Sequence, residues 1–389
     1  MSTMEIIGNG LLAPASGTPP RVEILRDPGP PAAEMDAAWR ALVGQSTAPD
    51  TVRQGPQFFR HLHAIGAPTA LAVLRDAGAV IGLAPLQVGT TRLEFGARGY
   101  NLWTVRLRSL DLLGSQPLGP ETPTFYDGLI RTLFDAFPAV QAIRLAGLPT
   151  DCAFSIHVRH SQAVQRIAHL YSVRGERLCH VAQLPPSWPA YLALVGKKRR
   201  HEVERQIRRA REHGGGVLKL ARIETVAQLG ELESALEGLG VRLTPNRAVG
   251  GGGRAELASL AAHGLFLGYV LYCGITPCAV ALGLQDRNRY QMDSIHTGLL
   301  PPQLSPGSCL RHLVSEDLIQ SGIAQIDYGF GEPKYSYSSI NTTHPRIALL
   351  LLRKNLANRL LCASHHVFQA GINVIKRRQN ASAQKERQQ

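Results

Sequence analysis

The segment Gln303–Ile319, QLSPGSCLRHLVSEDLI, limits the possible folds more than any other stretch of this chain. A strand-like run, Arg289–Thr297, leads through a loop rich in Gly and Pro to the sequence SPGS at Ser305–Ser308, and an apolar-periodic helix follows. Ser305 stands at an N-cap position and Pro306 at the first helical position. The N–H groups of such a helix start, with little side-chain bulk above them, can hold a pyrophosphate. A plain helix cap accounts equally well for this stretch taken alone.

The same order of elements is predicted in both halves of the chain, which indicates a weak internal duplication without residue identity. In the first half we expect helices at Met35–Val43, Pro56–Ala64 and Thr124–Phe137, a hairpin of Thr69–Leu74 with Val80–Val88, and strands at Leu107–Leu113 and Ala142–Leu145. In the second half we expect helices at Thr225–Leu239, Glu256–His263 and Cys309–Gln320, a hairpin of Leu265–Cys273 with Pro277–Gln285, and strands at Val217–Arg222, Arg289–Thr297, Gln325–Tyr328 and Arg346–Arg353. The predicted fold class is α/β (α+β), with mixed and mostly antiparallel sheets flanked by helices.

The chain of 389 residues is long enough for two domains of ordinary size. We predict a first domain over residues 21–158, a connector over 159–186, a second domain over 187–375 and a disordered basic tail over 376–389. A glycine-rich stretch at Arg247–Arg254 is not followed by Lys-Ser or Lys-Thr, so it is interpreted as a flexible flap and not as a phosphate-binding loop.

The formal net charge of +13 favours an anionic partner: a phosphorylated cofactor, a nucleic acid or a membrane surface. Much of this charge lies in the predicted helix Lys197–His213, which ends at a run of glycines. The stretch Lys197–Arg211 is therefore a candidate surface for tRNA or for anionic lipid headgroups. A solvated helix face is the alternative, and the absence of interleaved aromatic residues argues against stacking on single-stranded nucleic acid.

Cysteine spacing argues against a metal site. The six cysteines include no CxxC pair, and no His lies at zinc-ligand spacing from Cys273 and Cys278. We expect reduced thiols in a cytoplasmic protein, with peripheral contact at the inner membrane as a variant. The N-terminal residues lack the pattern of a signal peptide. The longest apolar run, Ile347–Leu352, is too short to span a membrane.

From about Trp188 to Arg353 the chain resembles the GNAT acyltransferase superfamily, in the CelD-like branch named for cellulose biosynthesis and related to the Fem aminoacyl transferases. A basic helix opens with Lys197–Arg200, and an aromatic strand with Tyr290 precedes the Ser-Pro-Gly helix start. Asp327 opens the next strand, followed by Gly331 and the pair Lys334-Tyr335. In the family this pair runs Tyr-Lys and lies one residue further on, and the family's Asp after the aromatic strand is replaced here by Thr297 or Gly298. The first half resembles the degenerate N-terminal domain of tandem GNAT proteins.

The resemblance implies transfer of an acyl group from a CoA thioester to an amine, with no metal. The pyrophosphate would lie at the helix start Ser305, on the N–H groups of Gly307, Ser308, Cys309 and Leu310. The thioester would lie between the splayed strands of Tyr290 and Asp327. The resemblance assigns substrate contacts to Tyr290, Asp327, Lys334 and Tyr335.

Acyl transfer needs a base for the amine proton and an acid for the departing thiolate. Asp293, in the aromatic strand, is our first candidate for the base, followed by His296 and Glu332. Tyr328 is a candidate acid, together with Tyr335. Each residue also has an ordinary interpretation as an edge, surface or packing side chain. Cys309 suggests a covalent alternative, in which a thiol at a helix start is activated by His312 one turn later.

Three classes of function remain open at this point. The first is an N-acyltransferase that uses acyl-CoA, and acetyl-CoA above all, on a small or carrier-linked amine in polysaccharide or secondary-metabolite biosynthesis. The second is a Fem-type transferase that takes its aminoacyl group from tRNA. The third is a non-catalytic GNAT-like scaffold for exopolysaccharide synthesis.

Overall fold

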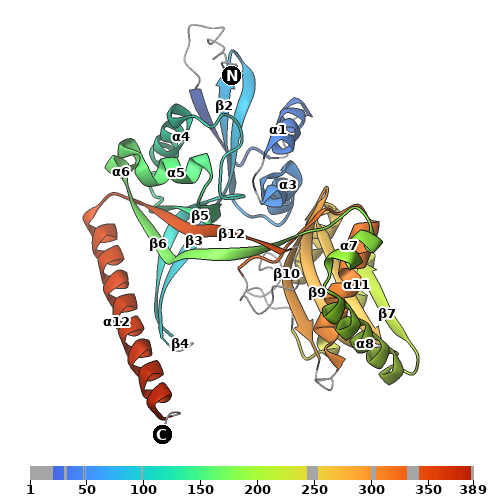
Figure 1. Ribbon diagram of the computed structural model, residues 1–389. Coiled ribbons are helices and arrows are strands. Elements are labelled where there is room, and N and C mark those ends of the chain that lie inside the picture. The colour runs from blue at the N-terminus through green and yellow to red at the C-terminus, as the bar shows by residue number, and fades with distance from the viewer. Residues whose placement is uncertain are drawn as a thin grey trace, which may run out of the picture.

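The computed structural model describes residues 21–29, 33–46, 48, 50–97, 100–242, 253–298, 304–330 and 341–386. These residues form a twelve-stranded sheet with helices packed on it, in the strand order β1-β2-β3-β4-β5-β12-β6-β11-β10-β9-β8-β7 (Figure 1). Neighbouring strands are antiparallel except for β4–β5 and β10–β11, which are parallel. The predicted fold class, mixed and mostly antiparallel with flanking helices, is therefore confirmed.

The described strands and helices have the following bounds. The strands are β1 Arg21–Arg26, β2 Thr69–Asp76, β3 Ala79–Ala97, β4 Tyr100–Leu112, β5 Ala142–Pro149, β6 Ala168–Gln183, β7 Leu218–Ile223, β8 Phe266–Cys273, β9 Thr276–Asp286, β10 Arg289–Thr297, β11 Gln325–Asp327 and β12 Asn341–Arg353. The helices are α1 Ala33–Gln45, α2 Thr51–Gln54, α3 Pro56–Ala64, α4 Pro123–Ala136, α5 Ala153–His160, α6 Gln162–Ile167, α7 Trp188–Leu194, α8 Lys197–His213, η1 Val226–Gln228, α9 Leu229–Gly238, α10 Arg254–Ala262, α11 Pro306–Gln320 and α12 Leu356–Glu386.

Each half contains one strand, then helices, then three antiparallel strands, then a helix that crosses to a parallel strand. In the first half α4 connects the parallel strands β4 and β5, and in the second half α11 connects β10 and β11. The predicted internal duplication is thus visible in the order of the elements.

The two halves share one sheet because each extends a strand onto the other. β6, which follows the first half, pairs with β11 of the second half, and β12, which follows the second half, pairs with β5 of the first. β6 and β12 also pair with each other along most of their length. The predicted connector at residues 159–186 therefore contains a central strand of a continuous sheet, and the domain limits stay a prediction.

Buried apolar residues fill three main layers beside the sheet. One core lies under α4, α5 and α6 in the first half, and another lies under α8 and α11 in the second half. The third core joins the halves, because α1 and α3 pack with α9 and α10 over strands from both. Burial of this shared apolar surface stabilises the arrangement of the halves.

The end of the chain differs from the sequence-based expectation. The tail predicted to be disordered from residue 376 is helical as far as Glu386, as the C-terminal part of α12. The predicted flap at Arg247–Arg254 lies mostly outside the described residues. Among the described residues, no helix has both the length and the apolar character that crossing a membrane requires.

A buried histidine lies in the core that joins the halves. His61 of α3 is fully buried, and its Nδ1 lies 2.9 Å from Ser259 Oγ of α10. Its Nε2 is 4.0 Å from the Glu256 carboxylate, and the His263 ring stands edge-on to it. Burial, with a smaller contribution from His263, lowers the pKa of His61 from 6.5 to about 4. The distant carboxylate does not offset the loss of solvent, so His61 is neutral in the native protein.

We predict that this histidine makes the fold sensitive to acid. Below pH 6.5 the unfolded chain binds a proton at His61 that the folded chain does not accept until about pH 4, so stability falls as pH decreases through this window. One such histidine changes the free energy of unfolding by at most about 1.4 kcal/mol per pH unit. In urea unfolding between pH 6.5 and about 4, the free energy of unfolding should decrease less for His61→Gln than for the wild type. The variant His63→Gln, at an exposed position of the same helix, should follow the wild type; equal slopes for all three proteins would contradict the assignment.

Candidate functional site

The parallel strands β10 and β11 separate close to the start of α11. They pair over three residues only, and the last pair is Gln291 with Asp327. β10 then continues beside β9 as far as Thr297, whereas the chain after β11 stays with β6, where the Tyr328 N–H donates to the His180 carbonyl over 2.9 Å. An opening between the two strands therefore begins immediately after Gln291.

Asp293 lies at this opening because β10 has a β-bulge there. The register between β10 and β9 shifts between Met292 and Ser294, which leaves Asp293 as the extra residue. A bulge bends its strand and redirects a side chain. Met292 is buried in the core below α11, while the Asp293 carboxylate lies 3.9 Å from Arg53 Nη2 of α2. The bulge thus presents a carboxylate toward the first half of the chain.

Burial and Arg53 have opposite effects on the pKa of this carboxylate. Arg53 Nη1 donates to Gln291 Oε1 over 2.7 Å and lies 3.2 Å from Asp50 Oδ2. Burial raises the pKa of Asp293 above the ordinary value of 3.8, and Arg53 is the main influence that lowers it. A carboxylate with a raised pKa is a stronger base than one with the ordinary value, so Asp293 is suited to accept a proton from an amine.

The start of α11 faces the end of β10. Ser305 adopts a left-handed conformation with φ of 43°, and its carbonyl accepts from the Ser308 and Cys309 N–H groups over 2.9 and 3.2 Å. These two of the four predicted phosphate donors are therefore already engaged within the helix. A Cβ on Gly307 would lie 3.3 Å from Thr297 Cγ2, so the glycine allows the helix start to approach the strand closely.

An arginine from α8 lies beside this helix start. Arg199 Nη2 is 3.5 Å from Ser308 Oγ, and both residues line a small cavity of about 40 Å³. Tyr328 lines the same cavity, together with Tyr191 and His312. A guanidinium and a hydroxyl at a helix start can supplement backbone N–H groups in holding a phosphate.

The covalent alternative at Cys309 does not fit its surroundings. The Cys309 side chain is fully buried and its thiol donates to the Leu304 carbonyl over 3.4 Å. Burial raises its pKa to about 12, so the reactive thiolate is scarce at neutral pH. His312, the proposed base, packs edge-on against Trp188, and burial lowers its pKa.

The remaining predicted residues occupy different environments. Tyr290 is fully buried and its hydroxyl donates to the Leu267 carbonyl over 3.3 Å, which places its ring in the core. Asp327 is buried and accepts from Arg346 Nη2 and from the Gly329 N–H, both over 2.7 Å. His296 Nε2 lies 3.1 Å from Ser294 Oγ near the end of β10. Leu310 is a buried core residue of α11. Three predicted residues lie outside the described residues: Glu332, Lys334 and Tyr335.

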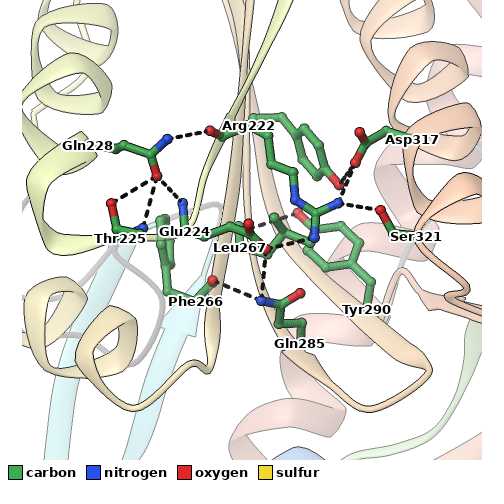
Figure 2. A network of polar contacts seen from close by, with 11 residues as sticks. Arg222, Glu224, Thr225, Gln228, Phe266, Leu267, Gln285, Tyr290, Asp317 and Ser321 are labelled. Carbon is green, nitrogen blue, oxygen red and sulfur yellow. Dashed lines mark hydrogen bonds and ion pairs between the residues drawn. The ribbon is translucent and has the colours of Figure 1, made fainter.

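A polar network holds the far end of α11 against the sheet (Figure 2). Asp317 of α11 accepts from Arg222 Nη1 over 2.6 Å. It also accepts from the Tyr269 hydroxyl over 2.7 Å. Arg222 of β7 also bonds Ser321 at the end of α11 and Glu224 after β7, over 2.7 Å each. Burial raises the pKa of Tyr269, so its hydroxyl stays protonated and donates to Asp317. These contacts fix α11 relative to β7 and β8, and so fix its start relative to β10.

Sequence reasoning missed Arg53 as a partner of the site. Arg53 and Gln291 are separated by 238 positions, and no local pattern connects a short helix of the first half to β10. Arg199 belongs to the basic helix that the sequence did indicate, although as a polyanion surface. The described residues contain no group of three or more His, Cys, Asp or Glu side chains that could hold a metal ion.

Comparisons with known proteins give a family match for the segment that contains this opening. Residues 197–337 match the family model of the acetyltransferase (GNAT) domain. Among solved structures, FemX superposes with a TM-score of 0.56 at 8% identity, over 87% of this chain and 100% of that one. A tandem GNAT protein from the clavulanic acid biosynthesis pathway gives 0.50 at 9% identity, over 86% and 98%. A C-terminal DUF2156 domain from Agrobacterium fabrum gives 0.50 at 13% identity, over 86% and 96%.

A search among curated protein sequences returned no significant match. The structural similarities extend over nearly the whole chain, but at these identities they show the fold alone. The family match covers the segment that contains α8, the β10–β11 opening and the start of α11. Residues 197–337 therefore match a GNAT acetyltransferase domain, which supports an acyltransferase, and the fold of the whole chain is similar to that of a tandem GNAT protein.

Proposed function

We propose that this chain is an N-acyltransferase that moves an acyl group from acyl-CoA, and specifically from acetyl-CoA, directly to an amine acceptor. The observation that supports this proposal most is the arrangement around the opening between β10 and β11. The start of α11 and Arg199 lie on one side, and the bulged Asp293 lies on the side toward the first half. A donor thioester and an amine could meet between them.

The residues can perform direct transfer without a covalent enzyme intermediate. The α11 start at Gly307, with the Ser308 hydroxyl and Arg199, would hold the pyrophosphate. Asp293 would take a proton from the ammonium form of the acceptor, and the freed amine would attack the thioester carbonyl. Collapse of the tetrahedral adduct breaks the C–S bond, Tyr328 would protonate the leaving thiolate, and the adduct nitrogen would give its second proton to the Tyr328 phenolate to leave a neutral amide. CoA supplies the activated acyl group, and the chain supplies positioning and proton transfer.

A thermal-shift screen of the full chain tests the donor. Acetyl-CoA, longer acyl-CoAs, free CoA and tRNA would be compared at equal ionic strength. A ligand at 100 times its dissociation constant stabilises the folded state by about 2.7 kcal/mol. We expect stabilisation by acetyl-CoA and free CoA. Stabilisation by tRNA alone would contradict the proposal.

The acid limb of the activity should depend on Arg53. Arg53 lowers the pKa of Asp293, so Arg53→Met should raise that pKa further and move the loss of activity on acidification to higher pH. The pH profile of kcat/KM reports the pKa of the free enzyme. Arg60→Met removes a comparably exposed arginine, which is paired with Asp36 at 2.6 Å, and should leave the acid limb in place. An unshifted profile in Arg53→Met would exclude Asp293 as the base.

A second candidate function is tRNA-dependent aminoacyl transfer of the Fem type, because the fold is similar to FemX and α8 is strongly basic. The exposed arginines of α8 include Arg205, Arg208 and Arg209. Two of these already have acidic neighbours on the helix: Arg205 lies 2.5 Å from Glu202, and Arg208 lies 3.9 Å from Glu212. Such pairing is also typical of a solvated face.

Two variants of the same helix separate the donor site from a polyanion surface. The triple variant Arg205→Gln, Arg208→Gln and Arg209→Gln should keep acetyl-CoA binding and lose any binding to tRNA or anionic vesicles, which weakens steeply with salt. Arg199→Gln should show the opposite result, with weaker acetyl-CoA binding and unchanged polyanion binding. If the wild type binds neither polyanion at low salt, α8 is a solvated face and the Fem-type candidate loses its support.

The finer expectations from the family resemblance belong to this proposal. They are membership of the CelD-like branch, a small or carrier-linked amine as acceptor, a place in polysaccharide or secondary-metabolite biosynthesis, and a cytoplasmic location with peripheral membrane contact. A non-catalytic scaffold is the remaining alternative. Acetyl-CoA binding without release of CoA for any amine tested would favour the scaffold.

A further inference from the structure

A cavity of about 360 Å³ lies where the two halves meet, on the central strands of the sheet. Arg289 of β10, Gln325 of β11 and Gln183 of β6 line it and lie in one row across the sheet, because they are register partners. The other lining residues come from β6, from β12, from β5 and the segment after it, and from two loops of the first half, and they include Arg346, Asp151 and Gln116.

Arg346 is a buried cation in the wall of this cavity with unused hydrogen-bonding capacity. The residue is 7% exposed, and its Nη2 donates to Asp327 Oδ2 over 2.7 Å. Its Nε is buried and has no hydrogen-bond partner among the described residues. An unpaired donor on a buried guanidinium costs free energy unless a ligand or solvent satisfies it.

Two guanidinium groups and two carboxylates meet at this cavity, and one of each is paired with the other. Arg289, whose Nη1 bonds the Ala48 carbonyl, is a second guanidinium in the wall. Asp151 is the one acidic residue among the described lining residues, and Asp327, behind Arg346, is already paired. Guanidinium groups bind carboxylates and phosphates through two parallel hydrogen bonds. Three glutamine amides add neutral donors and acceptors: Gln116, Gln183 and Gln325.

We propose that this cavity binds an oxyanion group, a carboxylate or a phosphate, of the amine acceptor. The inference rests on the proposed function, because it gives the acceptor an anchor near the candidate base. Arg289 and Asp293 are four residues apart on β10, which corresponds to roughly 13 Å along a strand. The acceptor is therefore an amine whose nitrogen lies roughly 10 Å or more from its anionic group, about the length of an extended tripeptide.

Nuclear magnetic resonance of the full chain labelled with ¹⁵N-arginine tests this site directly. The probes are triglycine, its C-terminal amide triglycinamide, and inorganic phosphate, all at constant ionic strength. The Arg346 Nε–H resonance, assigned by its absence in Arg346→Gln, should shift saturably with triglycine or with phosphate. Saturation by triglycine identifies a carboxylate, and saturation by phosphate alone identifies a phosphate. Triglycinamide should bind at least about tenfold more weakly, a difference of about 1.4 kcal/mol.

Arg346→Gln serves only to assign the resonance, because it also breaks the buried pair with Asp327. The affinities are compared in a variant of Arg289. Arg289→Gln should weaken the saturable response at least about tenfold. Arg287→Gln is the matched control, since it removes the same charge from the same hairpin. Arg287 donates to the Arg40 carbonyl and lines a different cavity. Responses that stay linear with every probe, or equal affinity in Arg289→Gln and the wild type, would overturn the proposal.

The same samples keep this proposal separate from the proposed function. Acetyl-CoA binding, measured by thermal shift, should be unchanged in Arg289→Gln. Saturable oxyanion binding without any response to acetyl-CoA would retain the cavity and reject the acyl-CoA donor. A response to acetyl-CoA without oxyanion binding would retain the acyl-CoA donor and reject the cavity as an oxyanion site.

Discussion

Replacing Asp293 with Asn should lower kcat by about 10²- to 10⁴-fold, the range expected for loss of a general base. Asn keeps the size of the side chain but cannot accept the ammonium proton. Affinity for acetyl-CoA should change little, because the α11 start and Arg199 lie on the other side of the opening. The measurement is steady-state CoA release with the best available amine, beside calorimetry of acetyl-CoA binding.

Asp286→Asn is the matched control for this prediction. Asp286 is the last residue of β9, in the same hairpin, and it lines a different cavity. Its replacement should leave kcat near the wild-type value. Equal turnover in Asp293→Asn and the wild type would transfer the role of base to His296, to Glu332 or to water.

The variant Gly307→Asp should weaken acetyl-CoA binding at least about a hundredfold, equal to about 2.7 kcal/mol. It would place a carboxylate where the pyrophosphate is expected. The fold should survive, because a Cβ at this position would meet one neighbouring atom within 4 Å, Thr297 Cγ2 at 3.3 Å. Calorimetry of the folded variant, checked by circular dichroism, measures the effect.

Gly230→Asp is a close control for this variant. Gly230 is also the second residue of its helix, α9, and a Cβ there would meet nothing within 4 Å. It adds the same charge at the same helical position, away from the opening, and should bind acetyl-CoA as the wild type does. If Gly307→Asp keeps wild-type affinity while folded, the start of α11 is only a helix cap.

Local patterns predicted most of the individual elements. The β8–β9 hairpin, β10 and α11 depend on apolar periodicity and on turn residues that lie within a few positions of each other. The position of Asp293 on a strand was predicted for the same reason. Its bulge was not, because a bulge is defined by the register with β9, and the sequence carries no signal for that register.

Contacts between distant segments could not be predicted in this way. The pairing of β6 with β12 joins residues such as Val181 and Thr342, where the Thr342 hydroxyl donates to the Val181 carbonyl across 161 positions. The Arg53–Gln291 bond and the junction cavity depend on the same long-range arrangement. Composition indicated a basic chain with an anionic partner, but it could not distribute the charge between Arg199, the exposed face of α8 and the cavity with Arg289 and Arg346.

A crystal structure of the full chain with acetyl-CoA tests the central claim most directly. The account predicts the pyrophosphate at Gly307 and Ser308 within reach of Arg199, and the thioester between β10 and β11 beside the bulge at Asp293. A saturated crystal with acetyl-CoA bound elsewhere, such as in the cavity with Arg289, would contradict the account.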